Sequence, residues 1–503
     1  MTNYIDWVPE IDPVFLALPL GAAAAAGLGA ASDAGAQHAD VRIGRSHEQN
    51  LSVRDRNLED QGEQSTTGMA VRVLVDGVWG FAAGDEVSVD AAARLGRQAV
   101  ELARQAAPLA ITRVELAAEP VHVGDWVSDF EVDPFAIPAH EKAELLLHWT
   151  GSLLDRGIQH ATASVRAVRE LSHYEDSSGT RTTQMRVRLG PEIDATVVED
   201  SGAFDSMGSL APPVGRGWEY LLRGWDFEEE LAQLPDLLQE KMRAPSVEAG
   251  TYDVVIDPTN LWLTIHESVG HATELDRALG YEANYAGTSF ATPDKLGTLQ
   301  YGSALMNIVG DRNVRFGLAT VGFDDEGVAA QKWDIVKNGT LVGYQLDRAM
   351  AHQFGVRSNG CAYADSPTHF PIQRMANVSL LPDPVGPSLD DLISGVEDGI
   401  YIVGDRSWSI DMQRYNFQFT GQRFHRIRAG RLVGQVRDVA YQSNTLDFWN
   451  RLQVLGGPQT YQLGGALNCG KGQPGQVAAV SHGCPAARFA GINILNSRSE
   501  SGS

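Results

Sequence analysis

Two histidines five residues apart, with a glutamate directly after the first, most constrain what this chain can fold into. They lie in the stretch His266–His271, which reads His-Glu-Ser-Val-Gly-His. On an ideal α-helix, residues i and i+5 differ by roughly 140°, so their side chains diverge. Both rings can face one metal ion only if the helix widens by a residue, as in a π-bulge. We therefore expect an irregular helix here, distorted near Gly270, where a distortion costs least sterically.

The residue types of this stretch are those of a catalytic zinc site. The neutral imidazoles of His266 and His271 would hold the metal ion, and the carboxylate of Glu267 beside them would handle protons. The alternative is that ordinary core and surface histidines meet at this spacing by chance. A closed structural zinc site is a third interpretation, but it needs no base, so Glu267 argues against it.

The composition and charge exclude several classes of function. The chain has 503 residues, enough for two to four domains. Its net charge of −24, without a Lys/Arg cluster, argues against nucleic-acid binding and against anionic membranes. The Ala-, Leu- and Gly-rich segment 14–31 follows no basic residue, so we expect a packed helix rather than a signal peptide or membrane span. The three cysteines, Cys361, Cys469 and Cys484, are too few for a disulfide framework and indicate a reducing cytoplasm.

The pattern along the chain predicts an α+β fold in two domains. Residues 1–245 are expected to form a mixed α/β domain, and residues 250–503 a mainly β domain that carries the metal-binding helix. The segment 244–250, with Pro, Ser and Gly, is the expected linker. The first domain should contain helices over 88–105, 139–155 and 226–243, the last broken or restarted at Pro235. Its expected strands are 40–43, 50–54, 69–75, 78–82, 164–174, 182–189 and 193–199, with an Asp76-Gly77 hairpin turn.

The second domain should open with a strand over 252–256, followed by the motif helix over 259–279. A long loop over 280–302 comes next, and loops of this length are often functional. Two hairpins are expected, one turning at Asn338-Gly339 and one at Ala429-Gly430. A late helix over 445–455 precedes the C-terminal strands.

Two histidines leave a catalytic zinc ion short of one protein ligand, because such sites usually have three and a water. Glu274 and Asp276 lie on the same predicted helix, and Cys469, His482 and Cys484 lie far along the chain. A Gly-rich loop could bring the Cys469 thiolate to the metal without crowding. A small buried hydrophobe is, however, the ordinary role of a single cysteine. The residues alone leave the third ligand open.

The motif His266-Glu267-x-x-x-His271 followed by Cys469-Gly470-Lys471 resembles the TldD subunits of the TldD/TldE (PmbA) metalloprotease family. Further segments agree in the family's order along nearly the whole chain: 39–42, 68–72, 324–327, 358–360 and 374–377. The resemblance implies a zinc peptidase with His266, His271 and Cys469 as ligands and Glu267 as general base. It places Glu274 behind the ligands and gives His482 and Cys484 no ligand role.

The resemblance also implies a TldE/PmbA-type partner subunit without the metal motif, and cytoplasmic action on unfolded or leader-type peptides. A peptide could reach the site as an added strand on a sheet edge. Two other functions stay open. One is a non-catalytic scaffold subunit, against which the retention of all four site residues argues. The other is a metal-dependent enzyme of natural-product maturation on the same fold.

Overall fold

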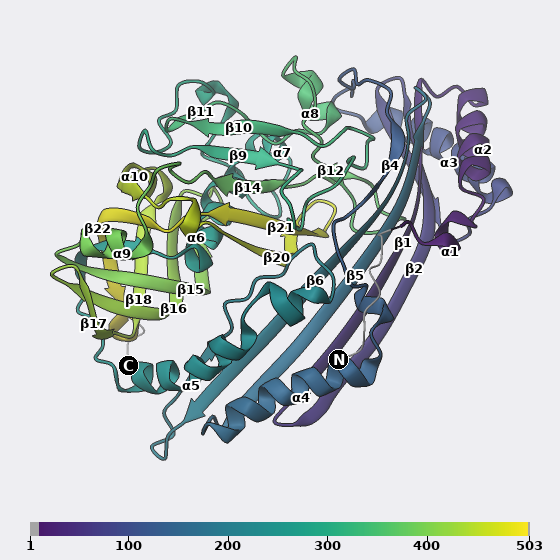
Figure 1. The fold of residues 1–503 in the computed structure, drawn as a ribbon. Coiled ribbons are helices and arrows are strands. Elements are labelled where there is room, and N and C mark those ends of the chain that lie inside the picture. Colours follow the sequence, from purple (N-terminus) through teal and green to yellow (C-terminus); the bar gives the residue numbers. More distant parts are fainter. Residues whose placement is uncertain (1–9, 501–503) are drawn as a thin grey trace.

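A long, mostly antiparallel sheet organises the first half of the molecule in the computed structural model, which describes residues 10–500 (Figure 1). Its strand order is β3-β2-β1-β5-β6-β4, and β7 also pairs with β6. The strands are β1 (His38–Arg54), β2 (Asn57–Val75), β3 (Val78–Gly84), β4 (Val123–Val127), β5 (His160–Asp176), β6 (Arg181–Val198) and β7 (Phe204–Gly208). Asp76 and Gly77 have positive φ values of 48° and 75°, which confirms the predicted hairpin turn between β2 and β3.

Helices pack on this sheet at both ends of its long strands. Figure 1 shows α2 (Leu20–Asp33) and α3 (Val89–Ala106) at one end, and α4 (Ala139–Asp155) and α5 (Phe227–Arg243) at the other. The short α1 (Pro13–Leu16) precedes α2. Ser88 caps α3 as predicted, because its hydroxyl accepts a hydrogen bond from the Ala91 amide at 3.1 Å. The alanine-rich segment forms α2, with buried Ala23, Ala24 and Ala31, so it is a packed helix. Among residues 10–500, no helix is long and apolar enough to cross a membrane.

Three predictions for the first half are wrong in extent. The expected strands 40–43 and 50–54 are one strand, β1, whose polar middle residues pair with β2 on one side and β5 on the other. The expected strands 182–189 and 193–199 are likewise one strand, β6, which passes through Pro191. The helix α5 continues through Pro235, whose side chain is buried. Continuous tertiary packing outweighs the local breaking signals in each case.

A closed barrel dominates the second half. The strands β15 (Asp398–Ile410), β8 (Gly250–Ile256), β22 (Ala487–Asn496), β18 (Val439–Asn444) and β16 (Asn416–Arg428) pair in this order. The barrel closes because β15 pairs with β16 as well as with β8. The hairpin from β16 to β17 (Arg431–Gln435) turns at Ala429-Gly430, as predicted. The predicted helix 445–455 is too long: α10 ends at Asn450, and Leu452–Leu455 form β19, paired with β22.

Smaller sheets lie beside the barrel. One consists of β9 (Ile308–Asp311), β10 (Lys332–Lys337), β11 (Thr340–Leu341) and β14 (Asn377–Leu380), and it contains the predicted hairpin at Asn338-Gly339. The pair β12 (Ala362–Tyr363) and β13 (Ile372–Gln373) is separate. The helices α8 (Arg348–Gln353), α9 (Leu389–Ser394) and α11 (Ser497–Glu500) are short. The two-stranded ribbon of β20 (Gln462–Lys471) and β21 (Gln476–Cys484) crosses α6 (Pro258–Ile265), the helix that leads into the histidine motif.

Candidate metal centre

The helix that carries the histidine motif widens at the motif, as its spacing predicted. The helix α6 begins at Pro258, with the Asp257 carboxylate capping the Thr259 amide at 3.0 Å. It is followed by a π-helical turn over His266–Gly270, in which the His271 amide bonds back to the His266 carbonyl. This five-residue step brings the two rings together, and their centroids lie 4.6 Å apart.

The rest of the predicted motif helix is not continuous. A 3₁₀ turn covers His271–Thr273, Glu274 has an extended backbone with ψ of 116°, and only Leu275–Ala278 resume an α-helix, α7. The prediction of one helix over 259–279 is therefore wrong beyond the motif. The break has a cause in the fold: the Thr273 carbonyl accepts from the Gln345 amide, so the backbone leaves the helical ladder to join a neighbouring segment.

Gly270 suits this position for a different reason than expected. Its φ and ψ of −52° and −62° are ordinary helical values. A Cβ at this position would lie 2.6 Å from the sulfur of Met375, so the missing side chain makes room for a close neighbour. The Gly270 carbonyl accepts from the Gln345 side chain at 2.7 Å, and the Ser268 carbonyl from the Tyr301 hydroxyl at 2.5 Å. These hydrogen bonds give partners to two backbone carbonyl groups of the distorted turn.

The structure brings together the three residues predicted as zinc ligands. His266, His271 and Cys469 are each buried, and their potential ligand atoms all lie within 4.8 Å of one another. The Cys469 sulfur is 3.6 Å from Nε2 of His271. We expected Cys469 in a Gly-rich loop, but it lies on strand β20, next to a bulge in the pairing of β20 with β21. A strand fixes the position of the thiol more firmly than a loop would.

Hydrogen bonds set the tautomer of His266. The buried His482 on β21 contacts the Val378 carbonyl with Nδ1 at 2.8 Å, so this nitrogen is the donor. Its Nε2 therefore accepts, at 2.7 Å, from Nδ1 of His266. The Nε2 lone pair of His266 is then free for a metal ion. His482 orients a candidate ligand rather than being one, a role that sequence reasoning missed.

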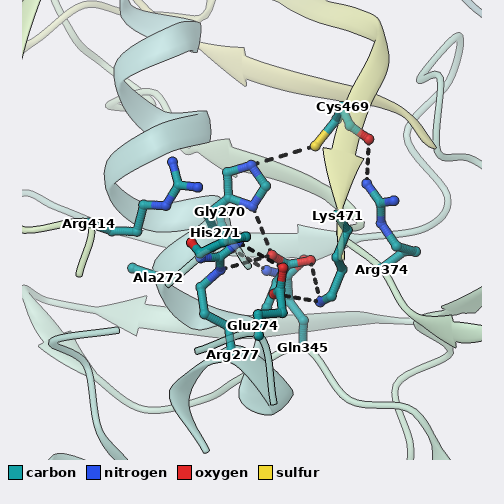
Figure 2. Close-up of polar contacts among 12 residues, drawn as sticks. Gly270, His271, Ala272, Glu274, Arg277, Gln345, Arg374, Arg414, Cys469 and Lys471 are labelled. Carbon is teal, nitrogen blue, oxygen red and sulfur yellow. Dashed lines mark hydrogen bonds and ion pairs between the residues drawn. The ribbon is translucent and has the colours of Figure 1, made fainter. Parts of the chain in front are cut away.

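Glu274 fixes His271 in the same way. Its carboxylate accepts from Nδ1 of His271 at 2.8 Å, which leaves Nε2 of His271 facing Cys469. Figure 2 shows the ring reaching Glu274 with one nitrogen and Cys469 with the other. Glu274 thus lies behind the candidate ligands, where the family resemblance placed it.

Burial keeps the three imidazoles neutral at physiological pH. It lowers the pKa of His266 well below the usual range, and the neighbouring His271 adds to this effect. Burial and the Arg414 charge lower the pKa of His271 to about 3, although Glu274 opposes them. Burial lowers the pKa of His482 to about 4. Only a neutral imidazole has a lone pair to offer a metal.

The predicted base, Glu267, lies in the same buried centre. Burial raises the pKa of Glu267, while the positive charge of Arg414 opposes that rise. A guanidinium nitrogen of Arg414 donates to the Glu267 carboxylate, and the Trp408 side chain also hydrogen-bonds it. Glu267 is not within the group of three candidate ligands. Its carboxylate is therefore available for proton transfer.

A buried ion cluster behind His271 was also missed by sequence reasoning. The ammonium of Lys471, on β20, lies 3.0 Å from Glu274, 2.8 Å from Asp276 and 3.5 Å from Glu282. The sequence left Asp276 open as a third metal ligand, but in the structure its carboxylate belongs to this ion cluster. Burial lowers the pKa of Lys471, but the three carboxylates more than offset it and raise the pKa overall. The cluster ties the strand of Cys469 to the turn that carries His271 (Figure 2).

The other cysteines lie away from this centre. Cys484, on β21, points its sulfur at the Pro258 carbonyl, 3.7 Å away. Cys361 is fully buried, and burial raises the pKa of its thiol to about 12. Both are inert as free thiols in these surroundings.

The centre opens into a cleft between the long sheet and the second half. The cleft has a volume of about 810 Å³. Residues of β1, β2, β5 and β6 line one side, among them Ser52, Asp60 and Arg166, and the other side holds His266, Glu267, His271, Arg414 and Cys469. A second hollow of about 500 Å³ shares several of these lining residues. The combined space admits an extended chain.

The donor set fits zinc. Two imidazole nitrogens and one thiolate are ligands that zinc prefers. With typical zinc–nitrogen and zinc–sulfur bond lengths, tetrahedral geometry separates a nitrogen ligand from a sulfur ligand by about 3.6 Å. The distance from the Cys469 sulfur to Nε2 of His271 is also 3.6 Å. Burial raises the pKa of the Cys469 thiol to about 11, and metal binding would deprotonate it.

Known proteins resemble this chain over most of its length. Residues 249–496 match the PmbA/TldA metallopeptidase C-terminal domain, and residues 39–103 match domain 1 of the same family. A metalloprotease of Methanothermobacter thermautotrophicus is 28% identical over 90% of this chain and 94% of its own. The zinc metalloprotease TldD homolog of Saccharolobus solfataricus is 26% identical over 53% of this chain and 56% of its own.

Solved structures share the fold. A protein of Thermotoga maritima described as a putative modulator of a DNA gyrase has a TM-score of 0.73, covering 93% of this chain and 98% of its own at 14% identity. TldE from Thermococcus kodakarensis has a TM-score of 0.67, with 93% of this chain and 98% of its own covered at 16% identity. The domain matches and the relatives are described as metallopeptidases or metalloproteases, the class that the family resemblance implied. The chain belongs to the PmbA/TldD metallopeptidase family.

Proposed function

We propose that this protein is a zinc-dependent peptidase that cleaves unfolded or leader-type peptides, with His266, His271 and Cys469 as zinc ligands and Glu267 as general base. The observation that carries this proposal is the convergence of the three donor atoms within 4.8 Å of one another, beside a buried carboxylate, in an open cleft. The zinc metalloprotease named among the relatives supports the choice of metal.

The protein's residues divide the chemistry between them. Bound zinc would polarise the scissile carbonyl and make water more acidic. Burial holds the pKa of Glu267 above its usual value, which suits a group that must take a proton and return it. Glu267 would accept the proton of the attacking water and pass it to the amine that leaves. His482 and Glu274 would keep the two imidazoles in the orientation that binds metal.

An extended peptide is the substrate that best fits the cleft. The cleft lies beside exposed faces of the long strands, and a folded domain would not enter about 810 Å³. The family also suggests a TldE/PmbA-type partner, since TldE has the same fold. A scaffold subunit would have no use for a buried base beside a three-donor site. A maturation enzyme that does not hydrolyse peptides is the second function to test.

The test compares Glu267→Gln with the wild-type protein, each co-purified with its TldE-type partner. Both are incubated with a library of unstructured peptides, and cleavage is followed by mass spectrometry. Glu267→Gln should keep its zinc and its fold but lose hydrolysis by ~10²-fold or more, the usual scale for loss of a general base. His266→Ala should lose zinc and hydrolysis together.

The exposed Glu144 on α4 supplies a matched control, because Glu144→Gln removes the same charge far from the cleft. This variant should cleave peptides like the wild type. Cleavage by Glu267→Gln at the wild-type rate would refute the proposed mechanism. Zinc binding without any peptide cleavage by the wild-type assembly would favour the maturation enzyme.

A further inference from the structure

Arg414 lies in the cleft in contact with the proposed base. Its side chain is 15% exposed, and a terminal guanidinium nitrogen donates to the Glu267 carboxylate. Arg166 is the other arginine that lines the cleft, but it belongs to the opposite wall and its Nε is 2.8 Å from Glu48. Arg414 is therefore the cleft arginine beside the proposed reacting centre.

The guanidinium of Arg414 has donors to spare. It carries five N–H groups in a planar fork, and one of them contacts Glu267. Among residues 10–500, its Nε is buried and has no hydrogen-bond partner. Arg414 lines the cleft, so its remaining N–H groups can donate to an acceptor on a ligand bound there. The acceptor must lie where Glu267 can also reach, because the two side chains touch.

The backbone holds Arg414 in a conformation that few L-residues adopt. Its φ is +62°, at the tip of the hairpin between β15 and β16. The Asp411 carboxylate accepts from the amides of Gln413 at 3.0 Å and Tyr415 at 2.8 Å, which fixes the turn. Left-handed backbone is usual at a hairpin turn, and here the hydrogen bonds of Asp411 fix the position of Arg414 within the turn.

Two further segments clamp the hairpin tip. The Thr445 hydroxyl at the start of α10 donates to the Arg414 carbonyl at 2.8 Å. The amides of Thr288 and Phe290 donate to the carbonyls of Met412 at 2.8 Å and Gln413 at 3.0 Å. Thr288 and Phe290 belong to the segment 280–302, which was predicted as a long loop. Its role in this place is to hold the hairpin against the centre.

We propose that Arg414 is a further catalytic residue, which binds the carbonyl oxygen of the scissile peptide bond and stabilises the negative charge that develops there. This inference rests on the proposed peptidase function. When the water oxygen bonds to the carbonyl carbon, the π electrons of the C=O bond move to its oxygen, and Glu267 takes the water's proton. When the C–N bond breaks, the C=O bond re-forms and the nitrogen receives the proton from Glu267.

The position and charge of Arg414 suit this task. A fixed donor aimed at developing charge stabilises the transition state more than the ground state, and one such donor contributes ~10²–10³-fold to kcat. A guanidinium can hold the Glu267 carboxylate and the substrate oxygen at once through different N–H groups. A role confined to holding Glu267 would use only part of the guanidinium fork, although Arg414 lines the cleft.

The test measures binding rather than turnover. The peptide that the wild type cleaves best is made in two forms: unchanged, and with a phosphinic group in place of the scissile amide to mimic the tetrahedral intermediate. Dissociation constants for both are measured on zinc-loaded assemblies in the inactive Glu267→Gln background, with and without Arg414→Gln. Arg414→Gln should weaken phosphinic-peptide binding by ~30-fold or more and change substrate-peptide binding by less than ~3-fold.

Removing Glu267 separates the two possible roles of Arg414. If Arg414 only holds Glu267, adding Arg414→Gln to the Glu267→Gln background leaves both affinities unchanged, and the proposal is wrong. An equal loss for both peptides would also overturn it, since Arg414 would then bind the ground state as well. Arg414→Lys retains the charge and should show a smaller loss for the phosphinic peptide. Arg414→Lys also provides the test if Arg414→Gln does not fold.

Arg315→Gln is the matched control, because Arg315 is 71% exposed and pairs with Asp129 outside the cleft. It should leave both affinities unchanged. Zinc content and cooperative unfolding are checked for every variant. Failure of the peptidase proposal has a different signature: the assembly with wild-type Arg414 would bind the phosphinic peptide no more tightly than the substrate peptide.

Discussion

Nε2 of His482 accepts a 2.7 Å hydrogen bond from Nδ1 of His266 across 216 residues of sequence. The Val378 carbonyl sets the direction of this bond, because it accepts from the other ring nitrogen of His482. The result is a candidate metal ligand whose tautomer and orientation are fixed by a neighbour on strand β21. Such indirect support typically changes metal affinity by 10–100-fold when it is removed.

We therefore expect His482→Leu to weaken zinc binding by ~10–100-fold, since His266 would lose the acceptor for its Nδ1 proton. His482→Gln should restore much of that affinity, because an amide oxygen can accept from His266 while the amide nitrogen donates to Val378. Competition with a chromogenic chelator measures both. Equal zinc affinities for His482→Leu and the wild type would show that this hydrogen bond does not support the metal.

The ligand assignment makes its own prediction. The wild-type protein should hold one zinc ion per chain, and Cys469→Ala should lose it, because two imidazoles alone bind zinc weakly. Cys361→Ala and Cys484→Ala are matched controls, since both thiols are buried away from the three donors. Elemental analysis after dialysis against a mild chelator distinguishes them. Undiminished zinc in Cys469→Ala would remove this cysteine from the site.

Local chemistry explains which parts of the fold could be predicted from the sequence. The Ser88 cap and the Asp76-Gly77 turn depend on residues a few positions apart, and both were confirmed. The helix widening at His266–Gly270 follows from helical geometry alone and was also confirmed. The lengths of β1 and β6 were not predictable in this way, because the polar middle of β1 shows no apolar alternation and Gly190-Pro191 in β6 is a local breaking signal. The division of the chain between residues 245 and 250 stays a prediction.

The supporting residues of the site depend on distant contacts. His482, Lys471 and Arg414 reach the centre from β21, β20 and a barrel hairpin, none of which adjoins the motif in sequence. Lys471 alone had a sequence signal, since it belongs to the Cys469-Gly470-Lys471 segment on which the family resemblance rests. For Arg414, the sequence Asp-Met-Gln-Arg-Tyr contains nothing that indicates a buried contact with Glu267.

The Lys471 cluster should be important for stability. Lys471→Met would leave Glu274, Asp276 and Glu282 buried without their shared cation. Breaking a buried ion pair from one side costs about 3–5 kcal/mol, so we expect a loss of this size in the free energy of unfolding. Urea denaturation measures it. Lys337→Met is the control, because Lys337 is 61% exposed in its pair with Asp334 and should leave the urea midpoint unchanged.

The last prediction concerns a buried ion pair between β5 and β6, which a hydrogen bond joins to the second half of the chain. Glu170 on β5 contacts Arg186 and Arg188 on β6 and accepts from the Tyr363 hydroxyl at 2.8 Å. Burial raises the pKa of Glu170, but the two arginines more than offset it and lower the pKa from 4.5 to about 2. The folded state therefore favours the charged carboxylate. Its stabilising effect is complete above pH 4.5 and is lost as the pH falls towards 2.

This shift in the Glu170 pKa corresponds to about 3 kcal/mol of stability at neutral pH and about half of that at pH 3. Glu170→Gln removes the titrating group, so its destabilisation relative to the wild type should be constant from pH 7 to pH 5 and shrink below pH 4.5. Urea unfolding at each pH measures the difference, with Glu144→Gln as the exposed control. A difference that stays constant down to pH 3 would mean that Glu170 has the same pKa in the folded and unfolded states. The arginines would then stabilise β5 and β6 through packing and not through the charge of Glu170.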